Sequence, residues 1–146
     1  MRFLRSELGE YLNGLGVSTD PAHRVLGGAD VGAATALGVA LELSDQYGAV
    51  LAQSPRLRSF VLDLQALELL PNGLIEAFVT QEPLPLRIWM EAGSHEHPVE
   101  VVAPSRRLHD VLRLRGYGVQ HREFQGAGEL HWQESLPEGL IALLGE

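Results

Sequence analysis

The chain has 146 residues, of which 45% are hydrophobic, and it carries a formal net charge of −8 at pH 7 and no cysteine. This length predicts one domain, residues 1–146, whose core needs neither a disulfide nor a metal to hold it together. The acidic balance argues against binding to nucleic acid, which requires a clustered basic surface. We interpret the one basic cluster as a solvated helix face; it consists of Arg106, Arg107, Arg113 and Arg115.

Neither a membrane span nor a secretion signal is evident in the sequence. Charges, glycines and prolines interrupt every apolar run before it reaches the ~20 residues that cross a bilayer. The opening residues 1–5 continue directly into Ser6 and Glu7, without the apolar core of a signal peptide. We therefore expect a cytoplasmic protein that does not contact a membrane.

Helical and strand-like patterns alternate along the first half of the chain. Apolar residues recur every three or four positions near the start, which predicts an amphipathic helix over residues 3–15. The patterns that follow predict, in order, a strand beginning at 25–26, a helix over 33–43, a strand over 49–52 and helical segments over 59–70 and 74–80.

The second half continues the alternation. It predicts a strand over 86–90, a helix opened by Pro104 or Ser105 and ended by Gly116, a strand over 119–124, and a final helix with Trp132 and four leucines on one side. Strands that alternate with helices indicate an α/β fold with about four parallel strands. If the strands are in sequential order, the joining helices lie on one face of the sheet and only the last helix can cross to the other.

The turn between the first strand and its helix carries the strongest motif. Gly28-Ala29-Asp30-Val31-Gly32 has the pattern of a nucleophile elbow, with Asp30 at the position where a serine is expected. The glycines allow a sharp turn and a close backbone approach, which leaves the middle side chain exposed above the sheet. The N–H of Val31 would be one oxyanion donor.

Further segments carry a recognisable pattern alongside this elbow. They are Phe3–Leu8, Val17–Pro21, Tyr47–Ser54, Leu86–Gly93, Leu108–Leu112, Gly116-Tyr117, Trp132 and Leu136–Leu140. Together they resemble the enterochelin esterase (putative esterase) family of the α/β-hydrolase fold. The resemblance covers nearly the whole chain and corresponds to the C-terminal half of such a protein. It implies an acyl-transfer site built from a serine nucleophile, a histidine base and an acid, with two N–H donors for the oxyanion.

Two of these catalytic groups, the serine nucleophile and the histidine base, are not found at the positions where the resemblance places them. The nucleophile position holds Asp30, and the histidine that follows the last strand is absent from residues 125–129, where its place falls on Gly128 or Ala127. His131, three residues further on, is the remaining candidate base. We interpret it as a partly exposed histidine at the start of a helix.

The acid is expected after the third strand. Glu91 and Glu96 are the candidates, and Glu96 is the better match because it lies in the loop. Without a histidine to orient, we expect Glu96 to be an ordinary surface carboxylate. We likewise expect the carboxylate of Asp30 to meet the N-terminal dipole of the helix that starts near Val31, an arrangement worth ~0.3–1 kcal/mol.

The favoured hypothesis is therefore a degenerate, non-catalytic esterase-like domain that serves as a scaffold or binding module. The alternative is a working hydrolase, either with a rearranged site or with Asp30 as a carboxylate nucleophile, as in haloalkane dehalogenases and epoxide hydrolases of this fold. No cofactor or metal is predicted. His95 and His97 form an H-x-H pair, but we interpret them as solvated loop residues because zinc needs three or four converging ligands.

Half of a hydrolase would expose its first strand and part of one sheet face. An unpaired apolar strand is a template for association. We therefore expect a symmetric homodimer that pairs through residues 24–29 or through the uncovered face. The alternative is a separate polypeptide that supplies the N-terminal half.

Overall fold

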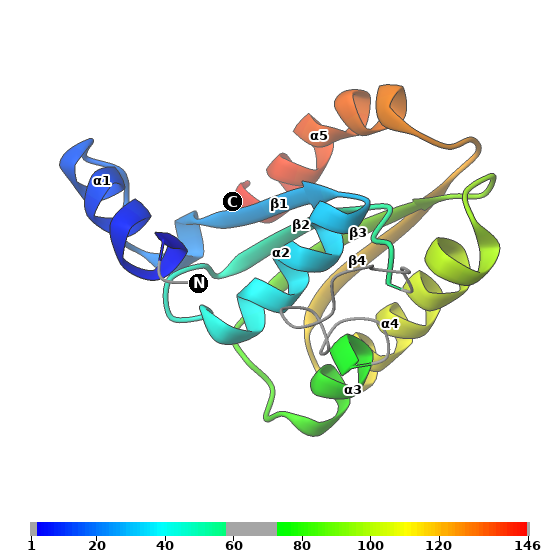
Figure 1. Cartoon of the computed structure of the whole chain (residues 1–146), viewed down its shortest axis with the longest axis horizontal. Helices are drawn as coiled ribbons and strands as arrows, with labels where there is room; N and C mark the ends of the chain where they lie inside the picture. The colour runs from blue at the N-terminus through cyan, green and yellow to red at the C-terminus, as the bar shows by residue number, and fades with distance from the viewer. Residues whose placement is uncertain (1–2, 58–72, 146) are drawn as a thin grey trace.

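The computed structural model describes residues 3–57 and 73–145. Its centre is a four-stranded parallel sheet in the sequential order β1-β2-β3-β4, with strands Val25–Ala29, Ala49–Gln53, Arg87–Gly93 and Gly118–Phe124. The register places Val50 of β2 between Leu26 and Ile88. This arrangement confirms the predicted α/β fold with four parallel strands (Figure 1).

The helices cover the two faces of the sheet unequally. One face carries α2, α3 and α4, and the other carries α5 (Figure 1); these helices span Val31–Glu42, Gly73–Thr80, Ala103–Leu114 and Glu129–Leu144. Sequential parallel strands require their connecting helices to lie on one side, because crossovers are right-handed. Among the helices that the structure describes after β1, the last is therefore the one that crosses to the other face, as predicted. The helix expected over 59–70 lies outside the described residues.

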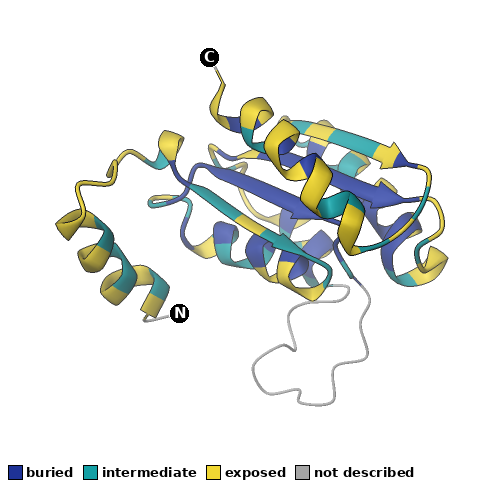
Figure 2. Ribbon diagram, turned by 90° about the horizontal axis from the view of Figure 1, so that it is seen from above, coloured by how far each residue is buried: buried dark blue, intermediate teal, exposed yellow. Residues whose placement is uncertain are grey.

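Two apolar clusters form the core, one on each side of the two inner strands. Val50, Ile88 and Met90 pack with the α2–α4 layer, whereas Leu51 and Trp89 pack under α5. Successive side chains of a strand point to opposite faces, which explains this division. Figure 2 shows the result: β2 and β3 are buried throughout most of their length, while the edge strands are more exposed.

The last helix packs closely on the sheet at Gly139. A Cβ at this position would lie 2.8 Å from Leu51 Cδ1 and 2.9 Å from Trp89 Cε3, both too close for real contacts. A glycine that lowers helix propensity therefore allows the helix to approach β2 and β3. The helix also runs continuously through Pro137, a residue that disfavours a helix interior, so tertiary packing must stabilise it.

The boundaries of α4 differ from the prediction at one end only. A π-helical turn over Pro98–Val102 leads into α4, so the helical segment begins before the predicted Pro104 or Ser105. Its start is supported by His97, whose Nδ1 accepts a hydrogen bond from the Glu100 N–H at 3.2 Å. The other end is as predicted: Gly116 has φ of 83°, and the next N–H donates back to Leu112 at 3.0 Å.

The N-terminal segment lies beside the body of the domain (Figure 1). The predicted single helix consists of a π-helical turn, Phe3–Glu7, followed by α1, Leu8–Gly14, and neither contains a buried residue. Tyr11 is 65% exposed, whereas Leu8 and Leu12 are half-buried, so the apolar side of this helix is only partly covered. Polar bonds hold the segment instead: the Arg5 guanidinium donates to the Glu42 carbonyl at 2.9 Å.

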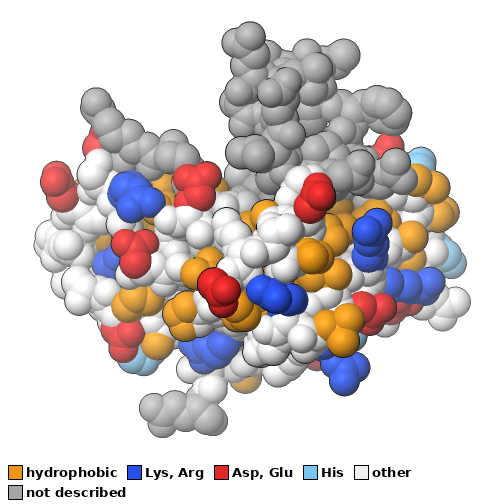
Figure 3. All heavy atoms as spheres, turned by 90° about the horizontal axis from the view of Figure 1, so that it is seen from below, with side chains coloured by type: hydrophobic (Ala, Val, Ile, Leu, Met, Phe, Trp, Pro, Cys, Tyr) orange, Lys and Arg blue, Asp and Glu red, His pale blue; other side chains and the backbone are white. Residues whose placement is uncertain are grey.

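The surface shows no segregation of charge on the face drawn in Figure 3, where acidic and basic side chains are interspersed with apolar ones. In the basic cluster of α4, Arg106 makes a two-point contact with Glu123, at 2.5 and 2.7 Å, so part of its charge is neutralised. Within the described ranges, no helix is long and apolar enough to cross a membrane.

A pair of histidines lies between α4 and β4. The rings of His109 and His121 are 5.2 Å apart, and His121 Nε2 is buried without a hydrogen-bond partner among the described residues. Burial lowers the pKa of His121 below its ordinary 6.5, and the neighbouring His109 lowers it further. The folded protein therefore favours the neutral imidazole at this position.

This shift predicts acid sensitivity. The unfolded chain binds a proton at His121 more readily than the folded chain does. The contribution of His121 to the free energy of unfolding is therefore fully present above pH 6.5 and is lost as the pH falls from 6.5 through the lower folded-state pKa. The urea midpoint should fall between pH 7 and pH 5, and His121→Gln should reduce the slope. Substitution of the exposed His95 by Gln is the control and should keep the wild-type slope; equal slopes in all three proteins would contradict the assignment.

Candidate functional site

The elbow predicted from the sequence is present between β1 and α2. Asp30 has φ 54° and ψ −119°, a conformation that is costly for a residue with a side chain. A Cβ on Gly28 would lie 2.5 Å from the carbonyl carbon and oxygen of Gly32, so the backbone passes close at this point. A Cβ on Gly32 would meet nothing within 4 Å. Of the two elbow glycines, therefore, only Gly28 is needed to avoid a steric clash.

The side chain of Asp30 is paired with a cation. Its Oδ1 accepts a hydrogen bond from Arg56 Nε at 2.7 Å, and the same guanidinium also contacts Glu100. The bond to Asp30 is the main cause that raises the pKa of Arg56. Asp30 is the N-cap residue of α2 but makes no side-chain capping bond to it, so the expected interaction with the helix dipole stays a prediction. Its partner lies 26 residues away, beyond the reach of motif-based reasoning.

Glu96 is not the ordinary surface carboxylate that the sequence predicted. Its Oε1 accepts the hydroxyl of Ser54 at 2.6 Å, and its Oε2 accepts the Gly93 N–H at 3.2 Å. The Gly128 N–H also approaches Oε1 at 3.5 Å. One of the two positions assigned to the absent histidine therefore lies beside the acid candidate. The side chain that donates to the Glu96 carboxylate is the Ser54 hydroxyl.

Ser54 links this acid to the last helix. It follows β2 directly, is 1% exposed and has φ of 50°. Its hydroxyl oxygen accepts a hydrogen bond from Trp132 Nε1 at 2.9 Å while donating to Glu96. A chain of hydrogen bonds therefore runs from α5 through Ser54 to the loop after β3. The sequence contained one signal for it, a serine at the carboxyl end of a buried strand.

His131 lies with the other acid candidate. Its Nε2 is 3.5 Å from Glu91 Oε2, and 3.3 Å from the guanidinium of Arg122. The ring stacks on Phe124 with centroids 3.5 Å apart. The candidate base and the better acid candidate, Glu96, are thus engaged with different partners. The interpretation of a partly exposed helix histidine agrees with its 25% side-chain exposure.

Glu91 is completely buried beneath α5. Its Oε1 accepts hydrogen bonds from Ser135 Oγ at 2.6 Å and from Gln53 Nε2 at 3.1 Å. These two donors come from α5 and β2 and satisfy Oε1, whereas Oε2 is buried without a hydrogen-bond partner among the described residues. Sequence reasoning missed this cluster, although a glutamate between the strand residues Met90 and Ala92 was a signal of it.

The remaining histidine candidates do not assemble into a metal site. His95 and His97 are exposed in the loop after β3, as expected. Within residues 3–57 and 73–145, no three His, Asp or Glu side chains come together in a way that could hold a metal ion. The chemistry available at the elbow is therefore that of an ion-paired carboxylate.

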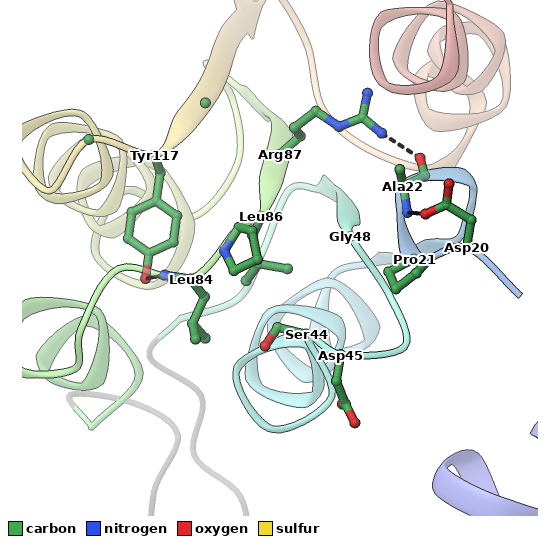
Figure 4. Close-up of a pocket in the computed structure, with 13 residues that line it drawn as sticks. Asp20, Pro21, Ala22, Ser44, Asp45, Gly48, Leu84, Leu86, Arg87 and Tyr117 are labelled. Atoms are coloured by element: carbon green, nitrogen blue, oxygen red, sulfur yellow. Dashed lines mark hydrogen bonds between the residues drawn. The ribbon is translucent and has the colours of Figure 1, made fainter.

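A hollow of about 640 Å³ lies at the end of the sheet opposite to the elbow (Figure 4). It borders Gly48 and Arg87, where β2 and β3 begin, whereas parallel sheets bind ligands at the carboxyl ends of their strands. Two of the charged side chains that line it are bonded to neighbouring backbone: Asp20 accepts the Ala22 N–H at 2.9 Å, and Arg87 donates to the Ala22 carbonyl at 2.5 Å. We therefore place the candidate site at the elbow end.

Comparisons with known proteins agree with this geometry. The model of the family described as "Putative esterase" matches residues 1–143. A search of curated proteins finds no match. Among solved structures, a ferulic acid esterase superposes with a TM-score of 0.81 at 17% identity, over 98% of this chain and 60% of its own.

Two further structures belong to named bacteria. The enterochelin esterase of Shigella flexneri has a TM-score of 0.79 and 24% identity, over 98% of this chain and 36% of its own. A fluorophosphonate-binding serine hydrolase of Staphylococcus aureus has a TM-score of 0.76 and 12% identity, over 96% of this chain and 62% of its own. These likenesses establish the shared fold. The present chain spans between about a third and two thirds of the length of these structures.

The elbow predicts opposite effects for its two glycines. Gly28→Ala places a methyl group against the backbone of Gly32, so it should lower the free energy of unfolding by about 1–3 kcal/mol or more. Gly32→Ala meets open space in the first turn of α2 and should be neutral or stabilising by up to about 1 kcal/mol. Urea unfolding of both variants checks this, and equal losses would show that the turn is not packed as described.

Proposed function

This chain belongs to the putative esterase family, and from that premise we propose that it is a degenerate member, which does not hydrolyse esters and acts as a homodimeric scaffold or binding module. One observation carries the loss of catalysis: Glu96, the acid candidate, receives the Ser54 hydroxyl at 2.6 Å instead of a histidine. An acyl-transfer site requires the acid to orient an imidazole base. Here the Ser54 hydroxyl occupies the Glu96 oxygen at which we expect the imidazole to bind.

The other groups support the same proposal. His131 faces Glu91 and Arg122, so it cannot serve Glu96 without rebuilding the loop after β4. At the elbow, Asp30 is bound by Arg56. A carboxylate that shares its lone pairs with a guanidinium is a weaker nucleophile than a free one, because the attack must break a charge-assisted hydrogen bond.

One observation favours the rival function, a hydrolase that uses Asp30 as its nucleophile. The backbone at Asp30 keeps the positive φ of 54° that presents the middle side chain of an elbow. Such an enzyme forms an ester on the carboxylate and then needs a base-activated water to hydrolyse it. No hydrogen bond or ion pair joins Asp30 to a histidine of the described residues, so we rank this function second.

Hydrolysis of p-nitrophenyl acetate and butyrate distinguishes the two functions. We expect no turnover above that of Asp30→Ala, and no gain in Asp30→Ser, because neither protein has a base for the nucleophile. Asp30→Ser also removes the partner of Arg56, so its folding should be verified by circular dichroism. Turnover that survives repurification and disappears in Asp30→Ala would establish the rival function.

The open edge of β1 supports the homodimer. The Asp30 N–H donates to Gln53, and the Arg24 carbonyl accepts from Ala49, so the even-numbered groups of this strand face β2. Alternate residues point the other way, which leaves the backbone groups of residues 25, 27 and 29 available for a second strand. A second copy pairing there about a twofold axis would bury them. The net charge of −8 opposes association but is screened within about 8 Å at physiological salt.

Light scattering after size-exclusion chromatography tests this interface. The wild-type chain should elute as a dimer, and Gly27→Lys should shift it to a monomer, because it places a charge on the exposed strand at a position whose Cβ has only ordinary contacts. Val79→Lys is the matched control, with the same added charge at an exposed apolar residue of α3, and should remain dimeric. A monomeric wild type would exclude the homodimer, and capture of a separate protein that completes the sheet would replace it with the two-polypeptide alternative.

A further inference from the structure

Gln53 has a hydrogen-bonding atom that the fold does not use. The side chain is 6% exposed, and its Nε2 lies 2.7 Å from the Trp132 carbonyl, 2.9 Å from Ser135 Oγ and 3.1 Å from Glu91 Oε1. A carbonyl and a carboxylate are acceptors only, which fixes the nitrogen of the amide on this side. The amide oxygen must therefore face the other way. It makes no hydrogen bond with any residue in the described part of the chain.

This amide lines a hollow of about 280 Å³ between the start of α5 and the end of β2. The other lining residues are Glu129, Trp132, Gln133 and Leu136. The walls thus offer one carboxylate, amide acceptors, an indole ring and an apolar side chain. No lysine or arginine of the described residues is among them. Such walls favour a donor-rich cation over an anion.

We propose that this hollow binds a guanidinium group. Glu129 supplies the charge-assisted hydrogen bonds, the oxygen of Gln53 accepts a further N–H, and the ring of Trp132 provides a surface for a planar cation. The Trp132 ring is held in place by the bond from its Nε1 to Ser54. The net charge of −8 adds a long-range attraction for cations. This inference rests on the proposed role as a binding module and names its ligand chemistry.

The position at a helix N-terminus counts against a cation, because that end of the helix carries partial positive charge. Here the first turn is already compensated. The Gly128 N–H, which precedes α5, points to the carboxylate of Glu96 at 3.5 Å, and Glu129 adds a second negative charge in the first turn. The local balance at the hollow therefore remains negative.

Binding of N-ethylguanidine at low millimolar concentration to the full chain, followed by NMR, tests the proposal. The side-chain amide signals of Gln53 and the indole N–H of Trp132 should shift saturably, whereas neutral N-ethylurea should leave them unchanged. Glu129→Gln should weaken the affinity several-fold, since it removes the charge but keeps the shape. Glu134→Gln, an exposed charge on the same helix outside the hollow, is the control and should bind like the wild type.

Two comparisons complete the experiment. A short peptide with one arginine, compared with the free guanidine, distinguishes a protein segment from a small molecule as the source of the group, and binding of either supports the site. Absence of saturable shifts with both probes, or equal affinity in Glu129→Gln, would overturn it. Ester hydrolysis is measured separately on the same preparation. A failure to bind guanidinium thus leaves the proposed loss of catalysis standing, and hydrolysis without binding would refute both.

Discussion

The buried carboxylate of Glu91 is the constraint on which the arrangement of this end of the molecule depends. It has no exposed surface, and an ionised group in such a place costs several kcal/mol unless donors surround it. Ser135 and Gln53 supply donors from α5 and β2, and His131 lies beside the second oxygen. These directional bonds define where along β2 and β3 the helix is placed.

The position of α5 decides in turn what the candidate catalytic groups can do. With the helix docked through Ser135 and at Gly139, the indole of Trp132 reaches Ser54, and Ser54 donates to Glu96. A histidine in the loop before the helix would have to compete with that serine for the same carboxylate. The helix thus acts on the acid candidate indirectly, because Trp132 holds the serine that donates to Glu96.

How far the sequence predicts this structure follows from the range of the interactions concerned. Periodicity and turn residues identified the order of strands and helices, since these depend on neighbours within a few positions. The sharp turn at Gly28 was predictable for the same reason. The partners of Asp30 and Glu96 were not: Arg56 and Ser54 lie 26 and 42 residues away, and their contacts exist only once the sheet has formed. Glu91 was considered only as a weak acid candidate because strand alternation gives a face but not the depth of burial.

The strained backbone at Asp30 is maintained by the groups around it. A positive φ at a residue with a side chain costs of order 1–3 kcal/mol and needs surrounding structure to maintain it. At Asp30 that structure comes from the segment that ends β2 and follows it: the Asp30 N–H donates to the Gln53 carbonyl at 2.9 Å, its carbonyl accepts from the Arg56 N–H at 3.1 Å, and its carboxylate binds the Arg56 guanidinium. The strain is therefore balanced by bonds that have no role in attack on an ester. The same bonds fix the start of α2 against the sheet.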